Sequence, residues 1–305
     1  MKILVTGGAG YVGSSLVDEL EKREDVETIY VLDNLSNASY AFFFGAKPYK
    51  KVQFVKGDIL DTYTVEQLID KVDVVFHLAG FVISPYNYTQ NVQYEQINQW
   101  GTLNLVRCVQ QSKNKIKRFV YLSSVSVLGL HGEVSLEDVP QPTNAYATSK
   151  FEGEKYVLLL ENHCETHIIR SGNVFGFNTS VRLDSVMNTF IFHALTDKKL
   201  LIYGDGTQQR PFVSIEACTK ILLDCIDDKK NGKQVKYALQ FNADLNQIKD
   251  WLIDEQVPDL EFTYINRNIS YKGQEIVGIK SLEENIPELN EVFDFFKSNI
   301  RISAQ

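Results

Sequence analysis

The chain has 305 residues, of which 44% are hydrophobic and 23% are charged. A chain of this size can bury most of its apolar surface in one large domain or two unequal domains without disulfides or structural metals. Its net charge of −8 argues against a nucleic-acid-binding surface, although backbone N–H groups can still hold a small anionic ligand.

The first 170 residues alternate short β-type runs with longer helical patterns. Residues 72–79, VDVVFHLA, are almost entirely apolar, as expected of a central parallel strand that is covered on both faces. The alternation predicts an α/β fold with a doubly wound parallel sheet of the Rossmann type. In chain order we expect strands at residues 2–6, 28–33, 52–57, 72–79, 118–124 and 166–171, and helices at residues 11–23, 90–111 and from 145 onward.

Beyond residue 172 the strict alternation ends, and the sequence predicts a smaller mixed α/β lobe. No internal repeat or low-complexity linker separates the two parts. We therefore expect two closely packed lobes, residues 1–172 and residues 173–305, with an approximate boundary and with segments that can interleave. The elements expected in the second lobe are helices at residues 185–195, 215–226 and 245–254 and a strand at residues 199–204.

The stretch VTGGAGYVG, residues 5–13, contains glycines in two overlapping frames. Gly8, Gly10 and Gly13 form G-x-G-x-x-G, whereas Gly7, Gly10 and Gly13 form G-x-x-G-x-x-G. In both frames the loop follows a strand and opens a helix, where glycines allow the backbone to approach a pyrophosphate at the helix N-terminus. The loop predicts a bound dinucleotide, and the positions of the catalytic residues decide the frame.

Asp33 ends the second predicted strand, 20 residues after Gly13. A carboxylate there accepts hydrogen bonds from the adenosine ribose hydroxyls and repels a 2′-phosphate, so it favours NAD over NADP. Asn34 and the absence of a following arginine agree with NAD. Asp58 and Ile59, after the third strand, are candidates for the edge of the adenine.

Tyr146 and Lys150 form a Y-x-x-x-K pair at the start of a predicted helix. Residues i and i+4 lie on one helix face, so the phenol and the ammonium can point into one cleft, where a cation lowers the pKa of a tyrosine. Ser124 ends the preceding strand and should face the nucleotide crevice at the carboxyl end of the sheet. Its hydroxyl can hydrogen-bond a substrate oxygen during proton transfer.

Taken together and in order, these motifs resemble those of the extended short-chain dehydrogenase/reductases, the NAD-dependent epimerase/dehydratase family of sugar-nucleotide enzymes. The resemblance selects the frame Gly7, Gly10, Gly13 and spans most of the chain, although the last 70 residues match poorly. The similar segments are TGGAGYVG (6–13), VLDNLS (31–36), GDI (57–59), FHLAG (76–80), NQWGTLNL (98–105), LSSVSVLG (122–129), NAYATSK (144–150), RSGNVFG (170–176) and YGDGTQQRPFV (203–213).

The resemblance implies a role for each matched residue, with NAD bound by the first lobe and substrate by the second. Tyr146 would be the acid/base on the sugar oxygen, and Lys150 would bind the nicotinamide ribose and depress the tyrosine pKa. Ser124, or less readily Ser126, would hydrogen-bond the reacting oxygen. The implied NAD-binding residues are Gly7, Gly10, Tyr11, Val12, Gly13, Asp33, Asn34, Asp58, Ile59, Leu78, Ala79, Gly80, Asn98 and Lys150. The implied contacts to the nucleotide-sugar diphosphate are Asn173 and Arg210, with Arg182 and Asn188 as further substrate-binding candidates.

The residues after Ser124 bear on the reaction. Dehydratases of the family usually carry Asp-Glu there and the xylose-forming decarboxylases a glutamate, whereas this chain has Val125 and Ser126. The acid that would expel a 6-hydroxyl is missing, so we do not expect dehydration. The resemblance, which is greater to UDP-galactose 4-epimerase, implies C4 epimerisation of a nucleoside-diphosphate hexose through a 4-keto intermediate, with NAD retained as a reversible hydride store.

Several departures from the family pattern keep other reactions open. Leu128 replaces a common tyrosine, and Pro211 and Ser214 replace an aspartate and a His or Tyr; no clear late Arg-x-x-Asp pair is present. An NAD-dependent NDP-sugar 4-dehydrogenase and a 4-keto-sugar reductase remain alternatives. A non-catalytic NAD-binding sensor or scaffold is disfavoured, because the Tyr–Lys pair and the serine are retained.

The remaining expectations concern partners and location. The four cysteines lack metal-binding spacing, which predicts reduced thiols and no metal site. No apolar run is long enough for a membrane span, and the apolar start is too short for a signal peptide, so we expect a cytoplasmic protein. The resemblance implies a homodimer that pairs helices near residues 90–111 and 145–162.

Overall fold

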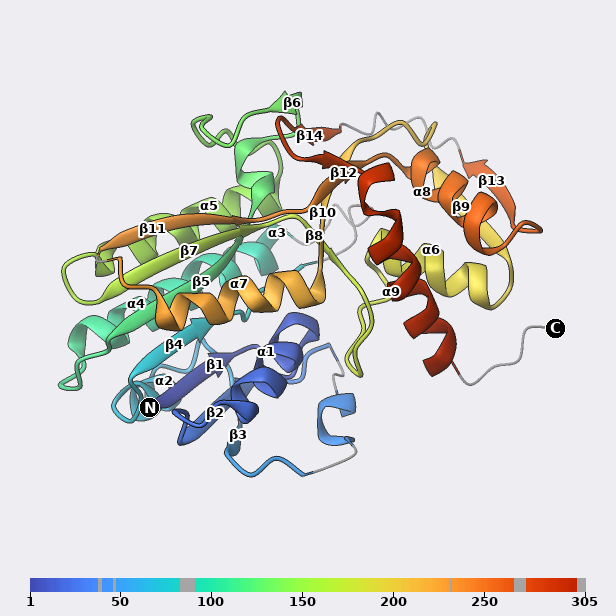
Figure 1. Ribbon diagram of the computed structural model, residues 1–305. Helices are drawn as coiled ribbons and strands as arrows, with labels where there is room; N and C mark the ends of the chain where they lie inside the picture. The colour runs from blue at the N-terminus through green and yellow to red at the C-terminus, as the bar shows by residue number, and fades with distance from the viewer. Residues whose placement is uncertain (38–39, 46–47, 83–90, 231, 266–272, 301–305) are drawn as a thin grey trace.

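The structure is a computed structural model that describes residues 1–37, 40–45, 48–82, 91–230, 232–265 and 273–300. Its larger lobe is built on a seven-stranded parallel sheet in the order β11-β7-β5-β4-β1-β2-β3 (Figure 1). The strand order reverses between β1 and β4, and ligands of such sheets bind at the carboxyl ends of the strands at this point. The strands are β1 (Lys2–Thr6), β2 (Thr28–Asp33), β3 (Val52–Lys56), β4 (Val74–His77), β5 (Arg118–Ser124), β7 (Glu165–Ser171) and β11 (Lys233–Ala238).

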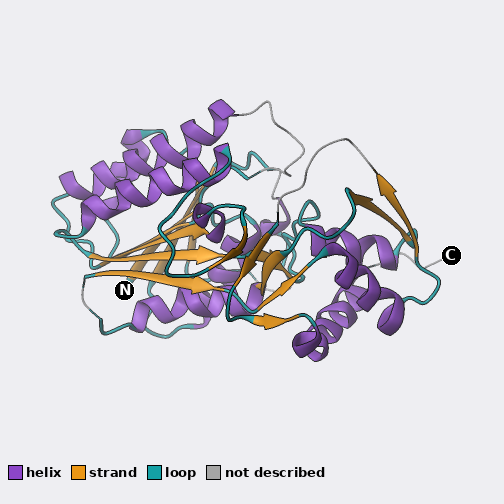
Figure 2. Ribbon diagram, turned by 90° about the horizontal axis from the view of Figure 1, so that it is seen from above, coloured by secondary structure: helices purple, strands orange, loops and turns teal. Residues whose placement is uncertain are grey.

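Helices cover both faces of this sheet (Figure 2). On one face α1 (Tyr11–Lys22) and α7 (Ile215–Asp227) pack against the strands through buried aliphatic side chains such as Leu16 and Leu222. On the other face lie α2 (Thr62–Ile69), α4 (Thr102–Gln111) and α5 (Ala145–Val157). All four residues of β4 are buried, which explains why its sequence is a continuous apolar run. The predicted doubly wound sheet is confirmed.

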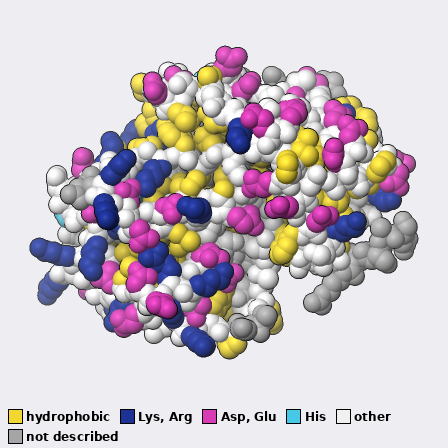
Figure 3. All heavy atoms as spheres, viewed as in Figure 1, with side chains coloured by type: hydrophobic (Ala, Val, Ile, Leu, Met, Phe, Trp, Pro, Cys, Tyr) yellow, Lys and Arg dark blue, Asp and Glu magenta, His cyan; other side chains and the backbone are white. Residues whose placement is uncertain are grey.

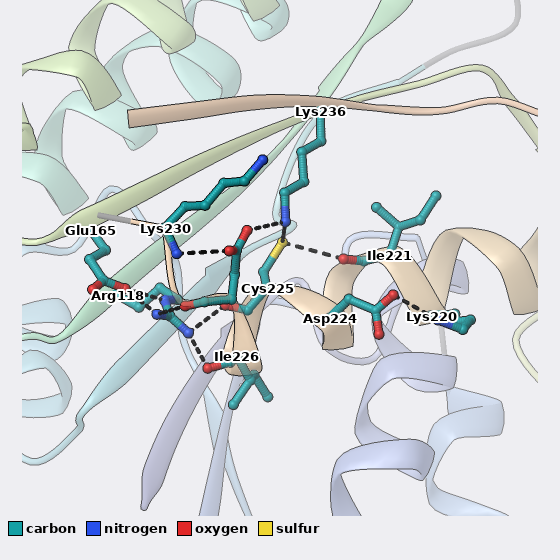
Figure 4. A network of polar contacts seen from close by, with 10 residues as sticks. Arg118, Glu165, Lys220, Ile221, Asp224, Cys225, Ile226, Lys230 and Lys236 are labelled. Carbon is teal, nitrogen blue, oxygen red and sulfur yellow. Dashed lines mark hydrogen bonds and ion pairs between the residues drawn. The ribbon is translucent and has the colours of Figure 1, made fainter. Parts of the chain in front are cut away.

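The chain returns to this sheet after it has entered the second lobe, because α7 and β11 belong to the first. Arg118, at the start of β5, donates to the carbonyl oxygens of Cys225, Ile226 and Asp228 and so closes the C-terminal end of α7 (Figure 4). The guanidinium also pairs with Glu165 of β7. The two lobes therefore interleave along the sequence, while their division of function at residue 172 stays a prediction.

The second lobe contains a four-stranded sheet in the order β15-β12-β10-β8 and a parallel pair of strands, β9 and β13. Phe175, Phe212 and Phe241 lie at its centre, with ring centroids of neighbouring pairs 5.6–6.4 Å apart. A second pair, β6 and β14, joins the lobes. The bounds are β6 (Gly132–Val134), β8 (Asn173–Phe175), β9 (Lys199–Tyr203), β10 (Arg210–Ser214), β12 (Phe241–Ala243), β13 (Glu261–Ile265), β14 (Gln274–Ile276), β15 (Lys280–Ser281), α6 (Val186–Leu195), α8 (Leu245–Trp251) and α9 (Ile286–Asn299).

The structure departs from the sequence predictions inside two helices and in elements that the sequence did not predict, most of them short strands of the second lobe. The helix expected at residues 90–111 begins with α3 (Asn91–Gln93), continues as a π-helical turn over Tyr94–Gly101, and becomes α-helical in α4. The helix expected at 245–254 likewise passes into a π-helical turn, Leu252–Gln256. The sequence did not predict the helices α2 and α9 or the strands β6, β8, β10, β11, β12, β13, β14 and β15. Short 3₁₀ turns lie at Tyr40–Phe43, Val125–Leu128, Leu158–Leu160 and Glu283–Asn285.

The surface carries mixed charge. On the face drawn in Figure 3, lysine and arginine side chains intermingle with aspartate and glutamate, with apolar side chains between them. Within the described ranges, no helix combines the length and the apolar character that crossing a membrane requires.

Candidate active site

The glycine loop joins β1 to α1, and two of its positions have room only for glycine. Gly7 has φ +69°, and a Cβ there would lie 2.6 Å from the backbone nitrogen of Ala79. A Cβ at Gly13 would lie 2.2 Å from the carbonyl oxygen of Gly7. At Gly10 the nearest atom to a Cβ is 3.2 Å away. The loop therefore keeps the backbone bare at the N-terminus of α1, which fits the pyrophosphate of a dinucleotide.

A cleft of about 660 Å³, including its open mouth, runs from the glycine loop along the carboxyl ends of β1, β2, β3 and β4. Among the residues predicted to bind NAD, the cleft is lined by Gly7, Gly10, Asp33, Asn34, Asp58, Ile59, Ala79 and Gly80. Sequence reasoning missed the lining residues Leu32, Ser36, Asn37, Gly57, Phe81 and Ile97. Most of these residues are next to predicted ones in the sequence. Their position at the ends of the predicted strands was the feature of the sequence that could have identified them.

Asp33 is held by the glycine loop. Its carboxylate accepts hydrogen bonds from the backbone N–H groups of Ala9 (3.0 Å) and Leu35 (2.8 Å), and burial raises its pKa. Asn34 donates to Asp58 Oδ2 (2.8 Å), so these two predicted residues brace the same side of the cleft. A fixed carboxylate at the end of β2 fits a ribose with free hydroxyls.

The side chains of Tyr11, Val12 and Leu78 face protein rather than the cleft. Val12 and Leu78 pack on the core beneath α1. The Tyr11 hydroxyl donates to the carbonyl oxygen of Gly176 (2.6 Å) and accepts from Asn188 (3.4 Å). Tyr11 thus connects the first turn of the cofactor helix to the loop that follows β8 in the other lobe.

Ser124 and Tyr146 meet beside this cleft. The Asn144 side chain caps α5 by accepting from the Ala147 N–H (2.8 Å), which fixes the helix start and places Tyr146 in the first turn. Ser124 ends β5, and its hydroxyl lies beside the Tyr146 phenol. Burial raises the pKa of Tyr146, while the charge of Arg182 and the Ser124 hydroxyl act in the opposite direction. The pair can exchange a proton with one substrate oxygen.

Lys150 is buried one turn further along α5, 5% exposed. Burial lowers its pKa to about 7, and the nearby carboxylate of Glu154 opposes this shift. A Cβ on Gly80 would lie 3.6 Å from the Lys150 Nζ, so the ammonium reaches the wall of the NAD cleft. In this conformation the positive charge that acts to lower the Tyr146 pKa comes from Arg182.

Asn98 positions the site from behind. Its side-chain oxygen accepts from the Phe81 N–H (2.7 Å), and its amide nitrogen donates to the Phe81 carbonyl (3.0 Å) and to Ser149 Oγ (2.9 Å). Ser149 in turn donates to the carbonyl oxygen of Tyr146 (2.8 Å). Asn98 therefore links the segment after β4 to α5, the helix that carries Tyr146 and Lys150, from within the π-helical turn.

A buried histidine that the sequence did not single out extends this chain of hydrogen bonds. Thr102 donates to the Asn98 carbonyl (2.8 Å) and therefore accepts from His77 Nε2 (2.8 Å). The other ring nitrogen, Nδ1, then accepts from Thr6 Oγ1 (2.8 Å). Burial, reinforced by the charge of Lys150, lowers the His77 pKa to about 3, so the ring is neutral.

The predicted substrate residues lie on the second lobe. Asn173 is exposed on β8 and donates to the Pro211 carbonyl (3.1 Å), while Arg210 begins the neighbouring strand β10. Arg182 pairs with Asp184 and acts electrostatically on Tyr146.

Asn188 differs from these residues because it is fully buried. It accepts from the Gly176 N–H (2.9 Å) and donates to the Arg182 carbonyl (3.1 Å). In this conformation Asn188 holds the loop that carries Arg182 and does not open onto the surface. No group of three metal-binding side chains occurs in the described part of the chain.

Comparison with known proteins identifies the family. The family model of the NAD-dependent epimerase/dehydratases matches residues 3–242. A putative UDP-glucose 4-epimerase of Methanocaldococcus jannaschii is 34% identical over 238 residues, which cover 74% of this chain and 74% of the relative. Human dTDP-D-glucose 4,6-dehydratase is 28% identical over 262 residues, which cover 83% of this chain and 73% of the relative.

A solved structure shares the whole fold. The UDP-glucuronic acid 4-epimerase of Bacillus cereus, in complex with UDP-glucuronic acid and NAD, aligns with a TM-score of 0.84 at 25% identity, over 98% of this chain and 100% of that chain. The chain therefore belongs to the NAD-dependent epimerase/dehydratase family, as an NAD-dependent enzyme of the extended short-chain dehydrogenase/reductase type.

Proposed function

We propose that this protein is a nucleotide-sugar 4-epimerase that oxidises C4 of an NDP-hexose and reduces it again from the opposite face. The observation that carries the proposal is the wall of the site formed by the end of β5. The Ser124 hydroxyl lies beside the Tyr146 phenol and acts to lower its pKa. The next two positions hold the buried Val125 and Ser126, whose hydroxyl donates to Ser124 Oγ (3.0 Å). An acid to expel water from the sugar is missing at these positions, which favours epimerisation over dehydration.

The protein's own residues would handle the proton. Tyr146 would take the proton of the sugar 4-hydroxyl, and Ser124 would hold the same oxygen in line. Because burial raises the Tyr146 pKa, positive charge is needed beside the phenol, and Arg182 supplies part of it. Bound NAD would accept the hydride and return it, and its pyridinium ring would add further positive charge.

The substrate would span both lobes. We infer that Asn173 and Arg210, on neighbouring strands of the second lobe, contact the diphosphate, for which a guanidinium is suited by its paired donors. Arg182 and Asn188 would complete this side, with Asn188 acting through the loop that it holds. The relatives include enzymes named for UDP-sugars and for dTDP-glucose. A test of the substrate must therefore vary both the nucleotide base and the sugar.

The test is incubation of the purified protein with a panel of UDP-, dTDP-, GDP- and CDP-sugars, with NMR of the sugar ring and mass spectrometry. An epimerase gives a C4 epimer of unchanged mass without accumulating NADH. A product lighter by one water would assign a dehydratase. Stoichiometric NADH would favour the 4-dehydrogenase, and consumption of added NADH by a 4-keto sugar would favour the reductase.

A control variant separates catalysis from cofactor binding. Tyr146→Phe should lower turnover by about 10²–10⁴-fold while the protein still carries NAD, because only the proton-transferring oxygen is lost. If Tyr146→Phe converts sugars at the rate of the unchanged protein, the proposed catalytic role fails. A protein that binds NAD but alters no sugar in the panel would instead support the sensor or scaffold function.

We also expect a homodimer in the cytoplasm. Trp100, just before α4, and Leu159, just after α5, are each more than half exposed. Both offer apolar surface to a second copy of the chain. All four cysteines are free, as suits a reducing compartment. Light scattering after gel filtration tests the dimer, and Trp100→Glu should shift the mass toward that of one chain.

A further inference from the structure

An aromatic ring lies beneath the catalytic lysine. The Lys150 Nζ is 4.5 Å from the centroid of the Tyr121 ring, and both side chains are buried. Within the described ranges Nζ makes no hydrogen bond of standard geometry, and the ring face lies against it while the Glu154 carboxylate acts on it through its charge. Tyr121 lies in the middle of β5, three residues before Ser124.

The ring is fixed in place by its surroundings. It stacks on the neutral His77 ring, with centroids 5.3 Å apart and planes at 27°. Gly153 of α5 leaves the space that the phenol fills, because a Cβ there would lie 2.3 Å from the Tyr121 hydroxyl oxygen. The buried hydroxyl makes no hydrogen bond of standard geometry to a described residue, although Thr102 acts to lower the phenol's pKa against the effect of burial.

We propose that Tyr121 is a positioning residue that holds the Lys150 ammonium at the wall of the NAD cleft through a cation–π contact. The proposal rests on the role that the family resemblance implies for Lys150, the binding of the nicotinamide ribose, and on the proposed function of which that role is part. The negative face of an aromatic ring attracts a cation, and the attraction is stronger where water is excluded. The ring thereby stabilises the charged lysine without providing an acceptor that would compete with the ribose hydroxyls.

The groups around Lys150 make its charge sensitive to this contact. Burial disfavours the ammonium and brings the Lys150 pKa to about 7, and Glu154 on the same helix favours it. His77 on β4 is neutral because of its lowered pKa, and Tyr146 is protonated because burial raises its pKa. A lysine with a pKa near the working pH changes its charged fraction steeply when one stabilising contact is removed.

The test compares Tyr121→Leu, which removes the ring, with the matched control Tyr121→Phe, which keeps it. Lysine labelled with ¹³C at Cε is titrated by NMR in the full-length protein without substrate, and Lys150→Met assigns the signal. We expect the Lys150 pKa to fall by about 0.5–1.5 units in Tyr121→Leu and to stay within about 0.3 units in Tyr121→Phe. An unchanged or raised pKa in Tyr121→Leu, or an equal fall in Tyr121→Phe, would overturn the proposal.

Two further measurements keep the outcome interpretable. Tyr121→Met, which preserves more volume, replaces Tyr121→Leu if the smaller side chain prevents folding, and it is expected to show the same fall. The NMR titration needs no substrate, so it stands or fails independently of the epimerase assignment. The active enzyme should lose kcat as the Lys150 ammonium loses its proton. The alkaline limb of the pH profile of kcat should therefore move to lower pH in Tyr121→Leu but not in Tyr121→Phe.

Discussion

Glu154 and Arg170 form a buried, two-pronged ion pair one helical turn beyond Lys150. Arg170 Nε lies 3.0 Å from Glu154 Oε1, and its terminal nitrogen lies 2.8 Å from Oε2. Ser123 also donates to this carboxylate, at 2.5 Å. With Ser123, the pair joins α5 to β7 and β5, so it fixes the helix that carries Tyr146 and Lys150.

Glu154→Gln should destabilise the protein by about 3–5 kcal/mol, because it leaves the Arg170 guanidinium buried without its charge partner. Urea unfolding measures the change. The matched control is Glu152→Gln, which breaks a surface pair with Lys155 on the same helix and should cost less than about 1 kcal/mol. If the two substitutions lowered the free energy of unfolding equally, the buried pair would contribute no more to stability than the surface pair.

The glycine loop predicts a graded response to added methyl groups. Gly13→Ala forces a Cβ to 2.2 Å from a backbone oxygen, whereas Gly10→Ala brings it only to 3.2 Å. We expect Gly13→Ala to lower the free energy of unfolding by about 1–3 kcal/mol and to reduce bound NAD strongly, with a smaller effect of Gly10→Ala. Thermal melting and the NAD released on denaturation measure both, and the reverse order would contradict the geometry of the loop.

Asp33 should set the preference between NAD and NADP. Asp33→Asn keeps the size of the side chain but removes the charge that repels a 2′-phosphate, so we expect NADP to bind relatively better and NAD to bind about tenfold less tightly. Calorimetric titration of the nucleotide-free protein with each dinucleotide tests this. Glu24→Gln, at an exposed position just after α1, controls for net charge and should leave both affinities unchanged.

The buried lysine should leave a signature in the pH dependence of stability. Its pKa is about 7 in the folded protein and 10.5 for the unperturbed side chain, so the unfolded chain binds an additional proton between these values. The cost of burying Lys150 is complete below about pH 7 and is relieved as the pH rises toward 10.5. Lys150→Met should therefore be the more stable protein at pH 6.5, by a few kcal/mol, and this advantage should shrink at pH 9.5.

Urea unfolding of both proteins at these two pH values measures the difference. A gap that stays constant, or that grows with pH, would mean that the lysine is not held with a lowered pKa. Lys220→Met, on the exposed face of α7, provides the control and should show no pH-dependent gap.

The parts of the fold that the sequence predicted are those fixed by local patterns. The strands β1, β2 and β5 agree with the predicted ranges because each is an apolar run that is bounded by polar or glycine residues. The glycine loop could be located because its spacing reflects contacts within one turn of chain. The positions of Asp33 and Ser124 could also be predicted, because the carboxyl end of each parallel strand faces the crevice regardless of the order of the other strands.

Other features depend on contacts that no local pattern reveals. The edge strand β11 is half exposed and joins the sheet only because α7, locked at its end by Arg118, carries the chain back. The π-helical turn that presents Asn98 uses the same residue types as an α-helix and differs only in which carbonyl each N–H reaches. The sequence could not reveal that His77 is neutral or that Tyr121 lies under Lys150, because both follow from side chains on strands and helices that are distant in the chain.

The most direct test of the proposed function follows one hydrogen atom. UDP-hexoses carrying deuterium at C4 are incubated with the purified protein, and the sugar is examined by NMR and mass spectrometry. The proposed mechanism predicts a C4 epimer that retains its deuterium, because the hydride removed to NAD returns to the same carbon without meeting solvent. Loss of the label to solvent, or its transfer to released NADH, would contradict it.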